Sequence, residues 1–354
     1  MHTTNRGFTL IEIMVASAVF AIFMVGILNL LDTSTKISVV ETELSDTQEN
    51  VRFATYHIMR TARMMGSAMM PMAANVGGTD TWLAAEFNSN QSTNFTTPFG
   101  AVAVVDGSDV LTLRGFFEVA PFFIDRTDVM GPPDRVEVDE SEGGIVINHN
   151  FDSVDAANLE GRGLFFSGNI DQNEYAVGQV SGGATMTGTA PNRTLAIKFD
   201  GGSSQWSGLN PAGVTIPPAF NVYRVGVMDS YTYYVRPDFT LMRMRADSSS
   251  GGATPQPVAV NIGSLQVALG MDTSTPPDGV ADTWATAPTV GTVVAANSVV
   301  AMRITVLGRT PRAVPDWTEP VATFTVEDMD ITDIDRGHKW RRVEVVAALR
   351  NYLF

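Results

Sequence analysis

The chain has 354 residues, carries a formal net charge of −15 and contains no cysteine. Without cysteine the fold has neither disulfides nor thiolate metal sites, so its stability depends on an apolar core. A charge this negative repels phosphate backbones, and nucleic acid is therefore not an expected partner. The length allows one large domain or two small domains beyond any membrane anchor.

The N-terminal region joins a short polar segment to a long apolar run. Residues 1–7 are polar, with Arg6 as the only basic side chain, and residues 8–31 are almost wholly apolar. A helix over that run measures about 36 Å, enough to cross a bilayer core of about 30 Å. An ordinary secretory signal has a shorter apolar core and a small-x-small cleavage site, and this sequence shows neither. We predict a transmembrane helix at 8–31, with the N-terminus in the cytoplasm and the acidic chain beyond it outside.

Glu12 lies inside this apolar run, where a charged side chain costs up to about 3 kcal/mol. One interpretation is local, because Thr9 and Glu12 have the Thr-x-x-Glu spacing of a capping box at a helix start. The other interpretation is that Glu12 receives a positively charged partner in an assembly. The residue pattern by itself leaves both interpretations open.

Residues 7–12 read Gly-Phe-Thr-Leu-Ile-Glu, and the apolar helix follows directly. This pattern resembles the type IV prepilin signature. The resemblance implies that residues 1–7 are a leader, which a prepilin peptidase removes by cutting between Gly7 and Phe8. It implies further that Phe8 becomes N-methylated and that Glu12 neutralises the terminal ammonium of a neighbouring subunit.

A helical pattern continues beyond the membrane. Apolar residues recur at spacings of three and four, at Ile37, Val40, Leu44, Val51, Ala54, Ile58 and Met65. The stretch contains no proline before residue 71, so we predict one helix from about Phe8 to about Met65, on the order of 85 Å long. A free coiled coil is the alternative. Because the apolar stripe is short and a β-rich chain follows, we expect this half of the helix to dock on the next domain.

Residues 71–354 are expected to form a β-rich external domain. Short β-type runs alternate with Gly, Pro, Asn, Asp and Ser, and they predict strands at 101–105, 110–114, 135–138, 144–148, 175–180, 194–199, 221–227, 231–236, 239–245, 265–269, 299–307 and 343–349. Loops are expected at 181–192, 246–257 and 272–292. The weakly patterned stretch 71–215 is interpreted as an insertion or second lobe. The predicted fold class is α+β: a long N-terminal helix (8–70), half in the membrane and half docked, on antiparallel sheets.

Four further segments resemble PilW-type minor pilins: residues 49–64 on the helix, 262–272, 299–304 and 341–351. They are looser patterns than the leader motif, and the middle of the chain has no such resemblance. The J pseudopilin of type II secretion has a similar plan of a helix with sheets, and it stays an alternative.

Catalytic motifs are missing from the sequence, which has no Gly-x-Ser-x-Gly, no His-Glu-x-x-His and no phosphate-binding glycine loop. No enzyme activity and no resident cofactor are expected. Asp272, Asp278 and Asp282 share one loop and could supply oxygen ligands to calcium. Their spacing does not match an EF-hand loop, and solvated turn carboxylates are the alternative.

The expected function is that of a minor pilin that helps to start assembly of a type IV pilus, in an initiation or tip complex. A type II secretion pseudopilin and an adhesin-like pilus-tip subunit are the alternatives, and a membrane-tethered enzyme is the rival of another class. Implied partners are other minor pilins, the major pilin, the prepilin peptidase, the inner-membrane assembly platform and a tip adhesin. The expected location is the inner membrane with the domain in the periplasm, and later the pilus on the cell surface.

Overall fold

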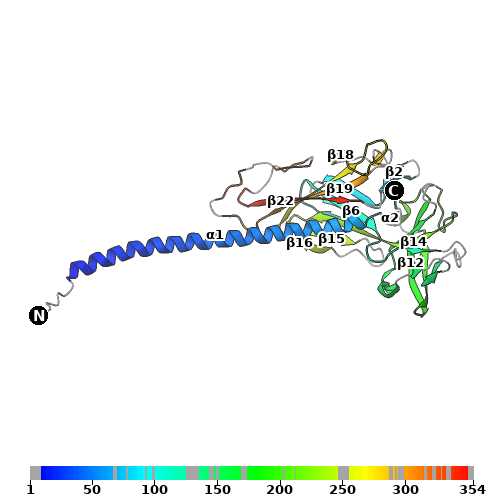
Figure 1. Cartoon of the computed structure of the whole chain (residues 1–354), viewed down its shortest axis with the longest axis horizontal. Coiled ribbons are helices and arrows are strands. Elements are labelled where there is room, and N and C mark those ends of the chain that lie inside the picture. Colours follow the sequence, from blue (N-terminus) through cyan, green and yellow to red (C-terminus); the bar gives the residue numbers. More distant parts are fainter. Residues whose placement is uncertain are drawn as a thin grey trace.

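The fold is a long helix that projects from a β-rich domain (Figure 1). The computed structural model describes residues 9–66, 70–76, 79–91, 94–97, 100–124, 135–142, 147–148, 151–168, 174–201, 204–211, 213–245, 255–286, 290–291, 293, 299–314, 317–320, 324–327, 329–331 and 336–349. Within that part of the chain a long helix precedes antiparallel sheets, which confirms the predicted fold class.

Helix α1 runs unbroken from Leu10 to Met64, in agreement with the prediction. It ends where Met65 becomes extended and Gly66 adopts a positive φ of 66°, a conformation that glycine reaches without strain. Its membrane-proximal half stands clear of the domain in Figure 1. Burial begins only at Thr47, and Ile37, which the apolar stripe placed in the docked half, is 53% exposed.

Ten strands form the larger sheet, in the order β16-β15-β14-β11-β12-β13-β8, with β3, β6 and β7 beside that path. Their bounds are β3 (Ala85–Gln91), β6 (Ser108–Gly115), β7 (Phe122–Phe123), β8 (Arg135–Asp139), β11 (Gly163–Ser167), β12 (Tyr175–Thr189), β13 (Asn192–Asp200), β14 (Arg224–Val235), β15 (Leu241–Arg245) and β16 (Gln256–Ala259). All the pairings are antiparallel.

A smaller sheet has the order β18-β17-β19-β22, with β17 (Ile262–Met271), β18 (Thr283–Ala285), β19 (Val299–Arg309) and β22 (Trp340–Ala348). Two-stranded ribbons complete the described strands: β1 (Ala73–Val76) with β2 (Thr79–Trp82), β4 (Asn94–Thr97) with β5 (Gly100–Ala103), β9 (Ser141–Glu142) with β10 (Ile147–Asn148), and β20 (Phe324–Val326) with β21 (Met329–Ile331). The outer half of α1 packs on β19 and β22, and also contacts β16 and β6.

The helix approaches β19 most closely at Gly308. A Cβ added there would lie 2.2 Å from Cγ2 of Val51, so only glycine admits the helix at this distance. The Thr47 hydroxyl donates a hydrogen bond to the carbonyl of Arg309 at 3.2 Å. Farther along, the Thr61 and Tyr233 hydroxyls lie 2.9 Å apart. Val51, Ala54 and other buried helix residues join the main apolar cluster with β6, β14, β17 and β19.

Two expectations about strands are wrong. The runs predicted at 221–227 and 231–236 are one strand, β14, because Asp229 and Ser230 between them are buried within the sheet. The loop predicted at 181–192 is the distal part of β12 and the start of β13, and Gly182 and Gly183 lie at a β-bulge rather than in a loop. The strands between 73 and 97 were not predicted, because their Ala-, Asn- and Thr-rich runs show little apolar alternation.

Strand β14 is shared by two apolar clusters. Val225 and Val227 pack with β8, β11, β12 and β13, whereas Tyr231 and Tyr233 pack in the cluster that includes α1. This second cluster is built chiefly from residues 119–227. The proposed boundary of an inserted lobe within 71–215 stays a prediction.

A buried ion network lies where these clusters meet. Arg162 donates to Asp229 at 3.2 Å and to Glu118 at 2.8 Å, and its side chain is only 4% exposed. Arg245 reaches the same two carboxylates, at 3.2 Å to Glu118 and 3.6 Å to Asp229. Tyr231 donates its hydroxyl to Glu118 at 3.0 Å. Two positive and two negative charges therefore balance at the centre of the domain.

The protonation of Asp229 is linked to stability. Burial raises the pKa of Asp229 from an ordinary 3.8 to about 6, although both arginines favour its ionised form. Between pH 4 and 6 the folded chain therefore keeps a proton that the unfolded chain has released. The contribution of this group to the free energy of unfolding is largest at low pH and is lost as pH rises through 6.

We predict that Gly308→Ala destabilises the detergent-solubilised full-length chain by about 1–3 kcal/mol, since Val51 has little rotamer freedom in a helix. Gly201→Ala is the matched control, because a Cβ at Gly201 meets no atom within 4 Å. Adding Val51→Ala to Gly308→Ala should reduce the steric part of the loss. Thermal unfolding measures all the variants. Equal effects of the two glycine substitutions would contradict the close helix contact.

We predict that Arg162→Gln lowers the free energy of unfolding at pH 7 by about 3–5 kcal/mol, since it leaves Asp229 buried with a weaker partner. The loss should shrink as the pH falls from 7 to 5, because Asp229 takes up a proton. The double variant with Asp229→Asn should recover most of the stability at pH 7. A loss that does not change with pH, measured by chemical unfolding, would argue against this linkage.

Candidate assembly site on the helix

The membrane-proximal half of α1 exposes its apolar side chains on all sides. Leu10, Phe20 and Ile22 are 78%, 64% and 74% exposed, and none of the most apolar 18-residue window is buried. The helix is long and apolar enough to cross a membrane. A surface of this kind is stable only when lipid or another apolar surface covers it.

Polar side chains along this half are bonded within the helix itself. The hydroxyls of Ser17, Thr33 and Thr35 donate to carbonyls four residues earlier at 2.7–2.8 Å. Just beyond the apolar run, Lys36 and Asp32 form an ion pair at 2.7 Å on the exposed helix surface. The hydroxyls therefore add little cost to burial in lipid, and the first side-chain ion pair comes where the apolar run ends.

Glu12 and Thr9 form the capping box that the sequence suggested. The Thr9 amide and hydroxyl both donate to Oε2 of Glu12 at 2.9 Å, and the Glu12 amide donates to the Thr9 hydroxyl at 3.3 Å. Within the described part of the chain no donor reaches the second carboxylate oxygen, Oε1. The local interpretation and the assembly interpretation are therefore compatible, because the cap uses only one oxygen.

The chemistry open to Glu12 follows from this geometry. A carboxylate in an apolar surrounding is stabilised most by a cation that also donates hydrogen bonds. Oε1 can accept from an ammonium group of another molecule without loss of the cap. Gly7 and Phe8, which the sequence assigned to cleavage and methylation, lie outside the described residues.

Asp272, Asp278 and Asp282 each organise their own loop after β17. Asp272 accepts from the amides of Ser274, Asp278 and Gly279 at 2.7–3.0 Å. Asp282 accepts from the amide and hydroxyl of Thr273. Among the described residues no three histidine, aspartate or glutamate side chains are grouped so that they could hold a metal ion. The arrangement favours turn carboxylates over a calcium site.

The sequence gave no signal for two features that the structure places at the helix. Gly308 lies in a strand pattern without any mark of close helix contact. The exposed aromatic residues Phe53 and Tyr56 were read only as part of the polar faces. A helical projection that separated the buried face from the outer face could have identified Phe53 and Tyr56.

Two family profiles match the chain. A profile described as Type IV Pilus-assembly protein W covers residues 223–351, from β14 to beyond β22. A profile described as the prokaryotic N-terminal methylation motif covers residues 3–28. No curated protein matches the sequence.

A type IV-like pilin from Thermus thermophilus is similar among solved structures, with 14% sequence identity and a TM-score of 0.23. The similarity covers 35% of this chain and 66% of the Thermus chain, just under two thirds of its length. At that score the superposition carries no argument about function.

We predict that Asp272→Ala makes the loop 272–282 more sensitive to proteolysis, because three amides lose their acceptor. Asp278→Ala, which removes a carboxylate bonded only to Val280, is the matched control. Hydrogen bonds from Ser274 and Gly279 hold the pKa of Asp272 below its ordinary 3.8. Its contribution is thus present above pH 4 and is lost on acidification below that value.

Metal removal tests the same loop. A chelator should leave the melting temperature of the full-length chain unchanged. An increase on adding millimolar calcium, present in the unaltered chain and absent from Asp272→Ala, would establish the calcium site instead.

Proposed function

Because this chain is a type IV pilin-like protein of the PilW type, we propose that it is a minor pilin which primes pilus assembly within an initiation or tip complex. The observation that carries the proposal is the structure of α1. One end is fixed in the domain by close packing, and the other end presents an uncovered apolar surface with Glu12 near its start.

The proposed mechanism is lateral packing of helices. Before assembly the apolar half of α1 lies in the inner membrane and the domain lies in the periplasm. The prepilin peptidase removes residues 1–7, and the new amino group belongs to Phe8. Oε1 of Glu12 then accepts the ammonium group of Phe8 of a neighbouring subunit, which gives both buried charges a partner. The complex offers a first layer to which the inner-membrane assembly platform adds major pilin.

The size of the external domain agrees with a position at one end of a filament. Residues 71–354 form a domain with two apolar clusters and a projecting β12–β13 hairpin. A domain of this bulk is accommodated more easily at an end than in every layer. At that position it would meet other minor pilins and a tip adhesin, and it would reach the cell surface with the pilus.

The experiment that tests the proposal deletes the gene and measures pili sheared from the cell surface, with type II secretion assayed beside them. Loss of pili with intact secretion, restored by the full-length chain, is the expected result. Normal pili with failed secretion would identify a secretion pseudopilin. Normal pili with normal secretion but lost adhesion would identify an adhesin-like accessory subunit.

We predict that Glu12→Ala is cleaved and stable but at least tenfold depleted in sheared filaments, since the ammonium of its neighbour loses its partner. Thr9→Ala is the matched control. It removes the cap, at a cost of about 0.5–2 kcal/mol to the helix end, but keeps the carboxylate. Immunoblots of filament and membrane fractions measure both variants. Equal depletion of the two would assign Glu12 to helix capping alone.

A further inference from the structure

The outer face of α1 carries a regular stripe of exposed side chains, opposite the face that docks on the domain. Its members, all exposed, follow the three–four spacing of a heptad seam: Val39, Thr42, Asp46, Glu49, Phe53, Tyr56, Arg60 and Arg63. We call them the outer stripe. Phe53 and Tyr56 are 53% and 60% exposed, and Val39 is 47% exposed. Two aromatic rings beside each other on a helix are typical of a contact surface.

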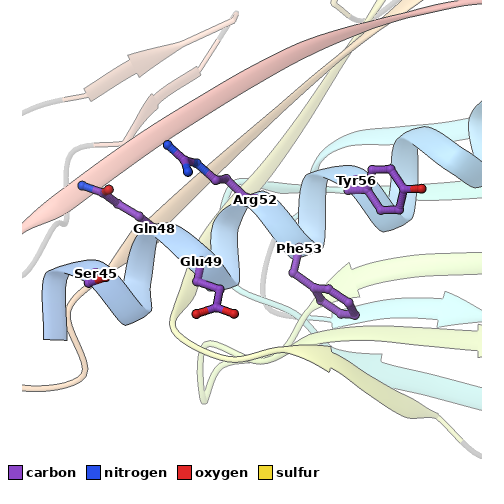
Figure 2. A pocket seen from close by; sticks show the side chains of 6 residues that line it. All are labelled: Ser45, Gln48, Glu49, Arg52, Phe53 and Tyr56. Atoms are coloured by element: carbon purple, nitrogen blue, oxygen red, sulfur yellow. The ribbon is translucent and has the colours of Figure 1, made fainter. Parts of the chain in front are cut away.

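A hollow of about 500 Å³ opens along this face, lined by Ser45, Gln48, Glu49, Arg52, Phe53 and Tyr56. Figure 2 shows Gln48 and Arg52 on one side of the helix and Glu49 and Phe53 on the other. The two rows of side chains flank a shallow groove along the helix. A groove between such rows is the shape that receives the side-chain ridge of a second helix.

The outer stripe consists of two matching halves. The membrane-proximal half has a small pair followed by an acidic pair: Val39, Thr42, Asp46 and Glu49. The distal half has an aromatic pair followed by a basic pair: Phe53, Tyr56, Arg60 and Arg63. Each residue of the first half lies fourteen positions before its counterpart, which is two heptads. A shift by whole heptads keeps the same face of a supercoiled helix toward its partner.

The charges distinguish between the possible registers of two parallel copies. Without a shift, Asp46, Glu49, Arg60 and Arg63 would each face the same residue of the other copy. A shift of fourteen residues places the acidic pair opposite the basic pair, and it places the small pair opposite the aromatic pair. A shift of seven residues forms neither acid–base pair. Opposite charges at such positions determine register and orientation in paired helices.

We propose that the outer stripe binds the α1 helix of a second copy of this chain, parallel and displaced by fourteen residues, or about 21 Å. The inference rests on the proposed function, because it names one partner of the assembling helix. A bilayer core of about 30 Å cannot hold both apolar runs at that displacement. The contact therefore forms when one copy is raised above the other, as a subunit leaves the membrane for the growing assembly.

Disulfide trapping tests the register, since the chain has no native cysteine. Two full-length copies with different tags, one Thr42→Cys and one Tyr56→Cys, are produced together in cells that lack the original gene. All four charged positions remain intact. In the displaced register these two positions lie within the roughly 4.4–6.8 Å between Cα atoms that a disulfide spans. The expected product is the mixed dimer, in at least tenfold excess over the Thr42→Cys homodimer.

A charge swap keeps the test independent of folding. Arg60→Glu with Arg63→Glu in the Tyr56→Cys copy should reduce the mixed dimer at least tenfold. Asp46→Arg with Glu49→Arg in the Thr42→Cys copy should then restore it. Homodimers in equal yield, no mixed dimer, or trapping that ignores the charges would overturn the proposal. So would chemical cross-linking of this face to another pilus subunit in place of a second copy.

Failure of this inference and failure of the proposed function are distinguishable. If the gene deletion removes pili but no mixed dimer forms, the priming function stands and the second-copy contact is wrong. If the mixed dimer forms and responds to the charge swap while pili are normal in the deletion strain, the priming function is wrong.

Discussion

The close contact between α1 and β19 is the constraint on which the rest of the structure depends. Gly308 lets the helix approach until Val51 and Thr47 lie against the strand, and the Thr47 hydroxyl bonds the Arg309 carbonyl. From this point outward the helix is buried in the domain, and from this point toward the N-terminus it has no protein cover. The contact thus divides one continuous helix into a segment solvated by protein and a segment that requires lipid or other helices.

The domain is built so that this division is held firmly. Strand β14 runs through both apolar clusters, and the network of Arg162, Asp229, Glu118 and Arg245 closes the space between them. Buried ion pairs of this kind contribute little net stability, but breaking one leaves a costly unpaired charge. The network therefore resists a relative movement of the two clusters. A force applied to the helix during assembly would be transmitted to a rigid body.

The sequence predicted the helix well because its signals are local and strong. An apolar run, a Thr-x-x-Glu start and a Gly66 end are each readable within a few residues, and the structure has all three. Glu12 was identified because an ionisable residue in an apolar run is exceptional. The resemblance to PilW-type pilins at the two ends is confirmed by the family profiles.

The sheets were predicted less well because their determinants are not local. Asp229 and Ser230 look like a break in β14, and only Arg162, distant in sequence, explains why a buried carboxylate is tolerated there. Gly182 and Gly183 look like a loop, but partner strand β13 holds them at a bulge. The register of the outer stripe was not seen because its polar members were read as a solvated face.

The most direct test of the divided helix is cysteine labelling of the full-length chain in membranes with an impermeant maleimide. Single cysteines replace Phe20, Ser45 and Ala54, of which Phe20 is exposed on the apolar half, Ser45 is exposed on the outer face and Ala54 is buried. The account predicts rapid labelling only at Ser45→Cys, with Ala54→Cys labelled after unfolding and Phe20→Cys labelled only after the bilayer is dissolved. Labelling of Ala54→Cys in the folded chain as fast as Ser45→Cys would show that the helix does not dock, and would contradict the account.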